Sequence, residues 1–166
     1  MKILSVFLIS GILFLILSSK GYSQDTKLTD DQLKTCILKV YDAFNKGDYS
    51  NLGDYIDANL VEHSPSPGQK PGLAGLEEMM DGLRKGFPDL KFTLNDVIIS
   101  GDKASALFTF TGTNSGEMMN MKPTGKKVDV QGIDYMYFKN GKCTEHWGYI
   151  DTDKWMAQMG YNQDQK

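Results

Sequence analysis

The sequence has few of the residues that catalytic and metal sites most often require. Its 166 residues include two histidines, His63 and His146, two cysteines and a single arginine, Arg84. No cysteine or histidine cluster has metal-ligand spacing, and there is no GxSxG elbow, phosphate-binding loop or dinucleotide fingerprint. The pattern disfavours a metal centre, a nucleotide cofactor and a serine nucleophile, and we expect no cofactor.

Long apolar runs are also absent after the N-terminus. Residues 1–23 have the composition of a secretory signal peptide, with a basic start, an apolar run over residues 3–17 and small residues up to Ser23. The apolar run is shorter than the roughly 20 residues that a membrane span needs. We therefore expect export to the periplasm or the medium, with cleavage near Ser23 and without a stable membrane anchor.

Positive charge is scarce in the remaining chain, residues 24–166, whose length is that of one domain. Without Lys2 and Lys20 the chain has 16 basic and 21 acidic residues, which gives a net charge of −5. There is no basic cluster. Nucleic acids and anionic membrane surfaces are therefore poor candidates as partners.

The two cysteines, Cys36 and Cys143, lie far apart in the sequence. Export would permit a disulfide between them. However, Cys36 falls on the apolar stripe of a predicted helix and Cys143 in a predicted strand, which is also typical of two buried thiols. The sequence leaves both alternatives open.

Apolar periodicity predicts helices first and strands afterwards. A 3.6-residue period predicts a helix that starts near Thr29, and a period of two appears from Leu90 onward. The predicted helices cover residues 29–44, 49–56, 73–86 and 152–159, and the predicted strands cover residues 59–63, 90–95, 104–111 and the two arms of 126–151. This order indicates an α+β fold with helices on one face of a curved antiparallel sheet.

Residues 126–151 form a predicted β-hairpin around Asn140-Gly141. One face of its first arm is apolar, apart from a single carboxylate; this face carries Val128, Val130, Gly132, Asp134, Met136 and Phe138. An ionised carboxylate is rarely buried without a partner, because its desolvation is costly. Asp134 should therefore line a cavity or have a dedicated structural partner.

The turn decides which residue lies opposite Asp134. A two-residue turn at Asn140-Gly141 would pair Asp134 with Trp147 and place Glu145 on the same face. A three-residue loop would shift the register by one and pair Asp134 with His146. The residues of the turn alone leave both registers open.

Four stretches carry a resemblance to a known family: EHSPSPGQKPGLAGL (62–76), FPDLKFTL (87–94), TGTNSGEMMNMKPTGKKV (111–128) and GIDYMYFKNGKCTEHWGYID (132–151). They span most of the mature chain in the expected order. The sequence resembles the SnoaL-like polyketide cyclase, or ester cyclase, family of the NTF2-like superfamily. The resemblance implies a cone: a strongly curved antiparallel sheet packed on N-terminal helices, with an apolar pocket inside.

The resemblance also implies cofactor-free acid/base chemistry, in which a pocket group removes a proton next to a carbonyl and a ring closes. The family's acid/base aspartate aligns with Gly148, and a pocket histidine of the family aligns with Asp134. Glycine cannot transfer a proton, so this chain departs from the family there. Because both aligned positions belong to one inner face, the resemblance favours the three-residue turn with Asp134 opposite His146.

The predicted catalytic residues are Asp134, His146 and His63. Asp134 would be the base, His146 its partner and His63 a polar group at the pocket mouth. The alternatives are a structural ion pair between two strands and, for His63, a surface side chain that caps a loop. The predicted substrate-binding residues are Phe44, Met79, Phe108, Asn114, Met118, Met121, Met136, Glu145 and Trp147.

The sequence thus predicts an exported protein that binds a small apolar or aromatic carbonyl compound. The first hypothesis is a cofactor-independent cyclase or isomerase. The alternative is a binding protein of the same fold that carries the compound without reacting it. A homodimer through the open sheet face is a further expectation.

Overall fold

The computed structural model describes residues 28–118 and 121–161. The predicted signal peptide, residues 1–23, and Met119 lie outside the described residues. The elements follow in the order α1 (Asp30–Lys46), a 3-10 turn η1 (Leu52–Asp54), β1 (Ile56–Glu62), α2 (Gly72–Gly86), β2 (Lys91–Ser100), β3 (Lys103–Thr113), β4 (Lys127–Lys139), β5 (Lys142–Ile150) and α3 (Thr152–Met159). The predicted α+β class is confirmed.

One five-stranded sheet has the strand order β1-β5-β4-β3-β2. Strands β2 to β5 form antiparallel neighbours, as predicted. The predicted helix over residues 49–56 is wrong, because only η1 is helical there and Ile56 already begins β1. β1 pairs with β5 in parallel, so the chain returns to the sheet edge beside its last strand.

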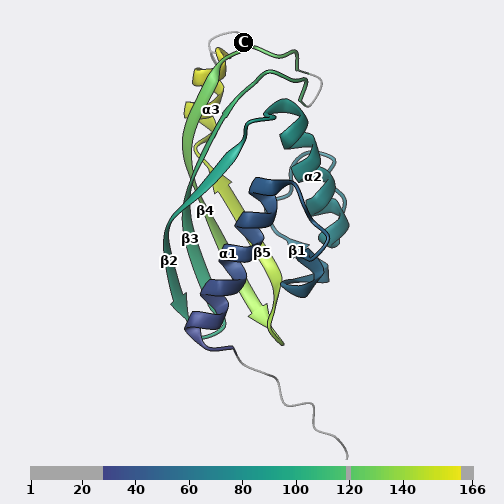
Figure 1. The fold of residues 1–166 in the computed structure, drawn as a ribbon, viewed down its shortest axis with the longest axis vertical. Helices are drawn as coiled ribbons and strands as arrows, with labels where there is room; N and C mark the ends of the chain where they lie inside the picture. The colour runs from purple at the N-terminus through teal and green to yellow at the C-terminus, as the bar shows by residue number, and fades with distance from the viewer. Residues whose placement is uncertain (1–27, 119–120, 162–166) are drawn as a thin grey trace, which may run out of the picture.

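The helices lie on one side of the curved sheet, where Figure 1 shows α1 and α2 beside each other and α3 near one end. α1 begins at a capping box in which Thr29 and Gln32 exchange hydrogen bonds. Its apolar stripe is buried and consists of Leu33, Ile37, Tyr41 and Phe44. Arg84 of α2 donates hydrogen bonds to the carbonyl oxygens of Phe44 and Asn45, which joins the two helices.

The hairpin turn corrects the predicted register. Asn140 and Gly141 both have positive φ, 51° and 81°, as a two-residue type I′ turn requires. The preferred three-residue loop is therefore wrong. The two-residue register does not continue either, because Phe138 pairs with Cys143 while Tyr137 pairs with Glu145.

Thr144 is the extra residue of this β-bulge, and it shifts the register by one. Asp134 consequently lies opposite Gly148, and His146 lies opposite Met136. The bulge gives the hairpin the same inner and outer faces as the three-residue loop would. Asp134 and His146 are diagonal neighbours on the inner face rather than a directly opposed pair.

Candidate functional site

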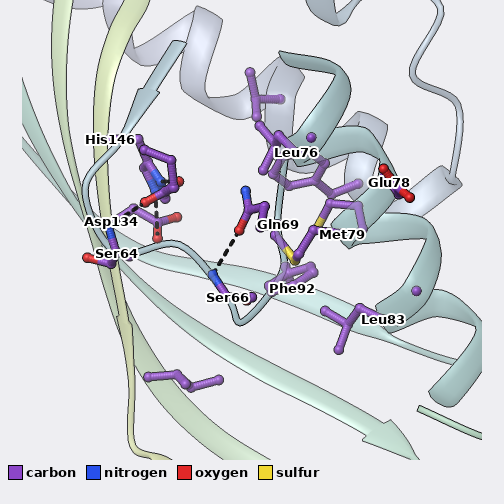
Figure 2. A pocket seen from close by; sticks show the side chains of 18 of the residues that line it. Ser64, Ser66, Gln69, Leu76, Glu78, Met79, Leu83, Phe92, Asp134 and His146 are labelled. Atoms are coloured by element: carbon purple, nitrogen blue, oxygen red, sulfur yellow. Dashed lines mark hydrogen bonds and ion pairs between the residues drawn. The ribbon is translucent and has the colours of Figure 1, made fainter. Parts of the chain in front are cut away.

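A cavity of about 820 Å³ lies between the sheet and the three helices. Its walls are mostly apolar, and every methionine in the described part of the chain lines it: Met79, Met80, Met118, Met121, Met136, Met156 and Met159. Figure 2 shows His146, Asp134 and Ser64 on one side of the pocket, with Met79, Leu83 and Phe92 on the other. A few polar groups on apolar walls are typical of a small-molecule site.

Eight of the predicted site residues line this cavity: Phe44, Met79, Phe108, Met118, Met121, Asp134, Met136 and His146. They come from α1, α2, β3, β4, β5 and the segment that joins β3 to β4. The cavity therefore brings together residues from most of the described chain, from Phe44 to His146. Their roles toward a ligand stay predictions.

His63, Glu145 and Trp147 lie on the outer face of the sheet, so their predicted place in the pocket is wrong. The ring of His63 stacks on Trp147, with centroids 3.8 Å apart, and its Nε2 lies 2.8 Å from Glu145 Oε2. The bulge at Thr144 shifts the register of β5, and this shift turns Glu145 and Trp147 to the outer face. His63 follows Glu62, and adjacent residues of a strand point to opposite faces.

Asn114 is buried, with 2% of its surface exposed, but it does not line the cavity. Its amide group donates hydrogen bonds to the carbonyl oxygens of Gly86 and Gly116. Its side-chain oxygen accepts one from the backbone N–H of Thr124 at 2.8 Å. Asn114 therefore holds the segment between β3 and β4 and is not part of the cavity wall, where the prediction placed it.

The imidazole of His146 lies between two carboxylates inside the cavity. Nδ1 is 2.6 Å from Glu62 Oε2, and Nε2 is 3.2 Å from Asp134 Oδ1. The hydroxyl of Tyr41 donates a hydrogen bond of 2.5 Å to Asp134 Oδ2. Four elements, α1, β1, β4 and β5, each contribute one residue to this Tyr41–Asp134–His146–Glu62 network.

Electrostatics keep the central histidine protonated. Burial alone would lower the pKa of His146, but hydrogen bonds to Asp134 and Glu62 outweigh burial and raise it to about 10. Burial likewise opposes ionisation of Glu62, yet the hydrogen bond and attraction of His146 lower its pKa below the ordinary value. His146 is therefore an imidazolium near neutral pH, with an N–H directed at each carboxylate.

The neighbouring titratable groups keep their protons. Burial, together with the charge of Asp134 and the hydrogen bond to it, raises the pKa of Tyr41 far above its ordinary value. Burial also raises the pKa of Cys143 to about 12. Cys36 and Cys143 both line the cavity as free thiols rather than as a disulfide. The charged groups of the network are thus two carboxylates and one imidazolium.

Glu62 and Tyr41 are network residues that the sequence-based prediction missed. Glu62 has a signal in the sequence, because the alternation of Leu60 and Glu62 in β1 puts a carboxylate on an apolar face. Tyr41 has none beyond its place on the α1 stripe, where an aromatic residue is ordinary core. Its hydroxyl is what distinguishes it.

Gly148 gives the network its open side. A β-carbon at this position would lie 3.0 Å from His146 Cε1 and 3.4 Å from Asp134 Oδ1. The backbone at Gly148 thus approaches both reactive groups without covering them. The resemblance places the family's acid/base aspartate at Gly148; in this chain the residue directly across the hairpin is Asp134.

Within the described residues, no group of three or more histidine, cysteine, aspartate and glutamate side chains is arranged to hold a metal ion. None of the helices that the structure describes is long and apolar enough to cross a membrane. What the site does offer is proton-transfer chemistry: a carboxylate and an imidazolium, side by side, in an apolar cavity. The fold and site thus define a cone-shaped α+β protein with an internal acid/base network.

Comparison with known proteins identifies the family. The model of the SnoaL-like polyketide cyclase family matches residues 34–159, and the chain belongs to this family. The chain is 26% identical over 129 residues to aklanonic acid methyl ester cyclase AcmA of Streptomyces galilaeus, a match that covers 75% of this chain and 88% of AcmA.

Solved structures agree with this assignment. TsrD from Streptomyces laurentii superposes with a TM-score of 0.76 at 25% identity, over 82% of this chain and all of TsrD. A SnoaL-like polyketide cyclase from Agrobacterium tumefaciens gives a TM-score of 0.65 at 22% identity, over 77% of this chain and 98% of that one, which shows the fold alone. The predicted NTF2-like cone is confirmed, and the family supports a cyclase-type function without a cofactor.

Proposed function

We propose that the mature protein removes a proton from a carbon next to a carbonyl in a small apolar or aromatic compound, and so promotes cyclisation or isomerisation. The observation that carries the proposal is the pair of Asp134 and His146, 3.2 Å apart in an apolar cavity of about 820 Å³. A proton on a carbon next to a carbonyl is only weakly acidic. A positioned base accepts this proton, and a nearby positive charge stabilises the negative charge that develops on the carbonyl oxygen.

Asp134 is the proposed base. Each carboxylate oxygen has two lone pairs, and Tyr41 and His146 use one on each oxygen. A lone pair therefore stays available on Oδ1, beside the open side left by Gly148. The hydrogen bonds hold the carboxylate in one orientation, as a catalytic base requires.

His146 supplies the positive charge. As the carbon loses its proton, negative charge develops on the carbonyl oxygen, and an imidazolium close to this oxygen stabilises it. Glu62 fixes the ring from the other side through Nδ1 at 2.6 Å. For ring closure, the enolate carbon then bonds to a second carbonyl carbon, and the new alkoxide takes the proton back from Asp134. No proton or electron is left over.

The test is turnover with a panel of apolar diketones that can close a ring intramolecularly. Mature wild type should form the cyclic product, and Asp134→Asn should abolish product formation while it retains affinity for the diketone. The matched control is Asp129→Asn on the exposed side of the same strand, which should retain turnover. Equal turnover by Asp134→Asn and wild type would refute the assignment of the base.

A second candidate is a binding protein that does not react its ligand. It is favoured by Gly148 at the position of the family's acid/base aspartate, and by the fact that both nitrogens of His146 already have carboxylate partners. In this case, wild type would bind apolar carbonyl compounds but show no turnover that Asp134→Asn could remove.

We propose export as well, on the strength of the composition of residues 1–23. Expression of the full chain in a bacterial host, followed by mass spectrometry of the secreted or periplasmic fraction, tests it. The expected mature protein begins at Gln24. Recovery of the uncleaved chain from the cytoplasm alone would contradict export.

A further inference from the structure

The segment between β1 and α2 contains a tight turn in the wall of the cavity. Its four residues, Ser66, Pro67, Gly68 and Gln69, all line the cavity. The backbone N–H of Gln69 donates to the carbonyl oxygen of Ser66 at 2.9 Å, and Gly68 has a positive φ of 78°. Proline at the second position and a glycine of positive φ at the third are typical of a type II turn. The backbone of this turn therefore has one well-defined conformation.

Helix α2 supports the turn from the next residues along the chain. Lys70 follows the turn, and its carbonyl oxygen approaches Gly75 so closely that a β-carbon there would clash with it. The ammonium group of Lys70 also forms a salt bridge of 2.8 Å with Glu78 of α2. The turn cannot move without loss of these contacts, so the position of Gln69 at the cavity is fixed before a ligand binds.

The side chain of Gln69 closes the turn and retains a free donor. The backbone N–H of Ser66 donates to Gln69 Oε1 at 3.0 Å. Because a backbone N–H only donates, the carboxamide oxygen must face Ser66, and the NH2 group must point the other way, as Figure 2 shows. Within the part of the chain that the structure describes, Nε2 has no hydrogen-bond partner and is not buried. A ligand can therefore reach it.

The charges around the cavity favour a neutral acceptor as the partner of this donor. The ammonium group next to Gln69, that of Lys70, is already paired with Glu78. Acidic groups in the walls slightly outnumber basic ones: the former are Glu62, Glu78, Glu117 and Asp134, and the latter are Lys70, Lys85 and protonated His146. A carboxylate would meet no excess of positive charge here, whereas a carbonyl oxygen accepts a hydrogen bond without adding charge.

We propose that Gln69 is a specificity-determining residue whose carboxamide NH2 group donates a hydrogen bond to a neutral oxygen of the ligand. The N–H groups of His146 and the O–H of Tyr41 already point at carboxylates, so they do not compete for this oxygen. A donor held in place by its own turn binds an acceptor without loss of side-chain freedom. The inference deepens the proposed function and rests on it for the class of ligand, a carbonyl compound.

The experiment compares probes of one outline: benzylacetone, its methylene analogue, in which =CH2 replaces the carbonyl oxygen, and the carboxylate hydrocinnamate. NMR titration gives their dissociation constants for mature wild type, Gln69→Glu and Gln131→Glu. Gln69→Glu keeps an oxygen for the N–H of Ser66 and replaces only the donor. Gln131→Glu is the matched control, because it is the same substitution at an exposed position of β4.

Gln69→Glu should weaken benzylacetone binding roughly tenfold, the effect of one lost hydrogen bond, and change binding of the methylene analogue less than twofold. Gln131→Glu should change neither, and wild type should bind hydrocinnamate more weakly than benzylacetone. Equal weakening of both neutral probes would mean that Gln69 acts through packing, and no weakening would mean that it does not contact the ligand. Tighter binding of hydrocinnamate, or no binding of benzylacetone to wild type, would overturn the class of acceptor. Each of these results refutes the proposal.

A second measurement observes the donor directly in wild type. The side-chain amide proton resonances of Gln69 are identified as the pair that Gln69→Glu lacks. Benzylacetone should move one of them downfield, and the methylene analogue should not; an unmoved pair would contradict the hydrogen bond. Neither measurement requires turnover, so the hydrogen bond can hold while the proposed acid/base function fails, and the two outcomes are distinguishable.

Discussion

At the scale of single residues, the central feature is a histidine with a carboxylate on each side. His146 contacts Glu62 through Nδ1 and Asp134 through Nε2, and only 20% of its side chain is exposed. A charged group in such a place is stable only because both of its N–H groups have partners. The two partners differ: Glu62 is the closer one, whereas Asp134 lies at the open side beside Gly148.

The raised pKa of His146 makes stability depend on pH. The pKa is about 10 in the folded protein and about 6.5 in an unfolded chain. The stabilisation is therefore complete below about pH 6.5 and is lost as the pH rises toward 10, by up to a few kcal/mol. Urea denaturation of wild type should show a free energy of unfolding that falls across this window.

The comparison that isolates His146 uses two variants. His146→Gln should lack this part of the pH dependence, whereas His63→Gln, which changes the outer-face histidine, should retain it. Tyrosine and lysine titrate in the same window in all three proteins, so only the difference between them is informative. Identical pH profiles of wild type and His146→Gln would contradict a protonated His146.

Glu62 should tune His146 rather than contact the substrate. Glu62→Gln removes one of the two negative charges, so the pKa of His146 should fall below about 10 when the imidazole is titrated by NMR. Glu145→Gln is the matched change on the other face of the sheet and should leave the titration of His146 unaltered. A titration that Glu62→Gln does not shift would remove Glu62 from the network.

At the scale of elements, the β4–β5 hairpin and β1 sort polar residues between the two faces of the sheet. Glu62-His63 at the end of β1 lies beside Glu145-His146 on β5, and each glutamate pairs with the histidine of the other segment. One pair therefore lies inside the cavity and the other outside. The bulge at Thr144 sets which residues of β5 face inward.

Gly148 is the position on β5 where an added atom would meet the acid/base network. In Gly148→Ala the new β-carbon would lie 3.0 Å from His146 Cε1, tighter than an ordinary contact, and 3.4 Å from Asp134 Oδ1. Turnover should fall on the order of tenfold while the fold is retained, since a small misplacement of reacting groups is costly. Steady-state kinetics and circular dichroism measure the two effects.

The control is Gly53→Ala in η1, outside the cavity walls, where a β-carbon would meet only Leu73 Cδ2 at an ordinary 3.8 Å. It should keep wild-type turnover. If Gly148→Ala were as active as Gly53→Ala, the approach to Asp134 would not pass Gly148.

At the scale of the whole molecule, the inner and outer faces of the sheet differ in what they contact. The inner face and the three helices enclose the cavity, while the outer face exposes apolar side chains such as Ile98 and Ile133, 66% and 46% exposed. We expect this face to mediate a homodimer. Sedimentation velocity should show a dimer for the mature wild type and a monomer for Ile133→Lys; a monomeric wild type at high concentration would contradict it.

Much of this architecture could be predicted from periodicity. The alternation in β4 placed Asp134 on the inner face, and the predicted helix starts near Thr29 and at residue 152 agree with the structure. The partners of Asp134 and His146 could not be predicted in the same way. Tyr41 and Asp134 are 93 residues apart, and Glu62 and His146 are 84 apart, so only the folded chain brings them together.

The hairpin shows why local signals were insufficient. Asn140-Gly141 correctly indicates a two-residue turn, and the family pattern correctly requires Asp134 and His146 on one face. These two indications conflict unless the hairpin contains an extra residue. Thr144 reconciles them, but nothing in its local sequence distinguishes a bulge from a regular strand position.

The most direct test of the account is proton exchange on a carbon acid, because it requires only the first chemical step. β-Tetralone in deuterated buffer is incubated with mature wild type, Asp134→Asn and Asp129→Asn, and the loss of its carbonyl-adjacent proton signals is followed by NMR. We predict exchange well above the buffer rate for wild type and Asp129→Asn, and exchange at the buffer rate for Asp134→Asn. Accelerated exchange that persists in Asp134→Asn, or a wild-type rate equal to that of buffer, would contradict it.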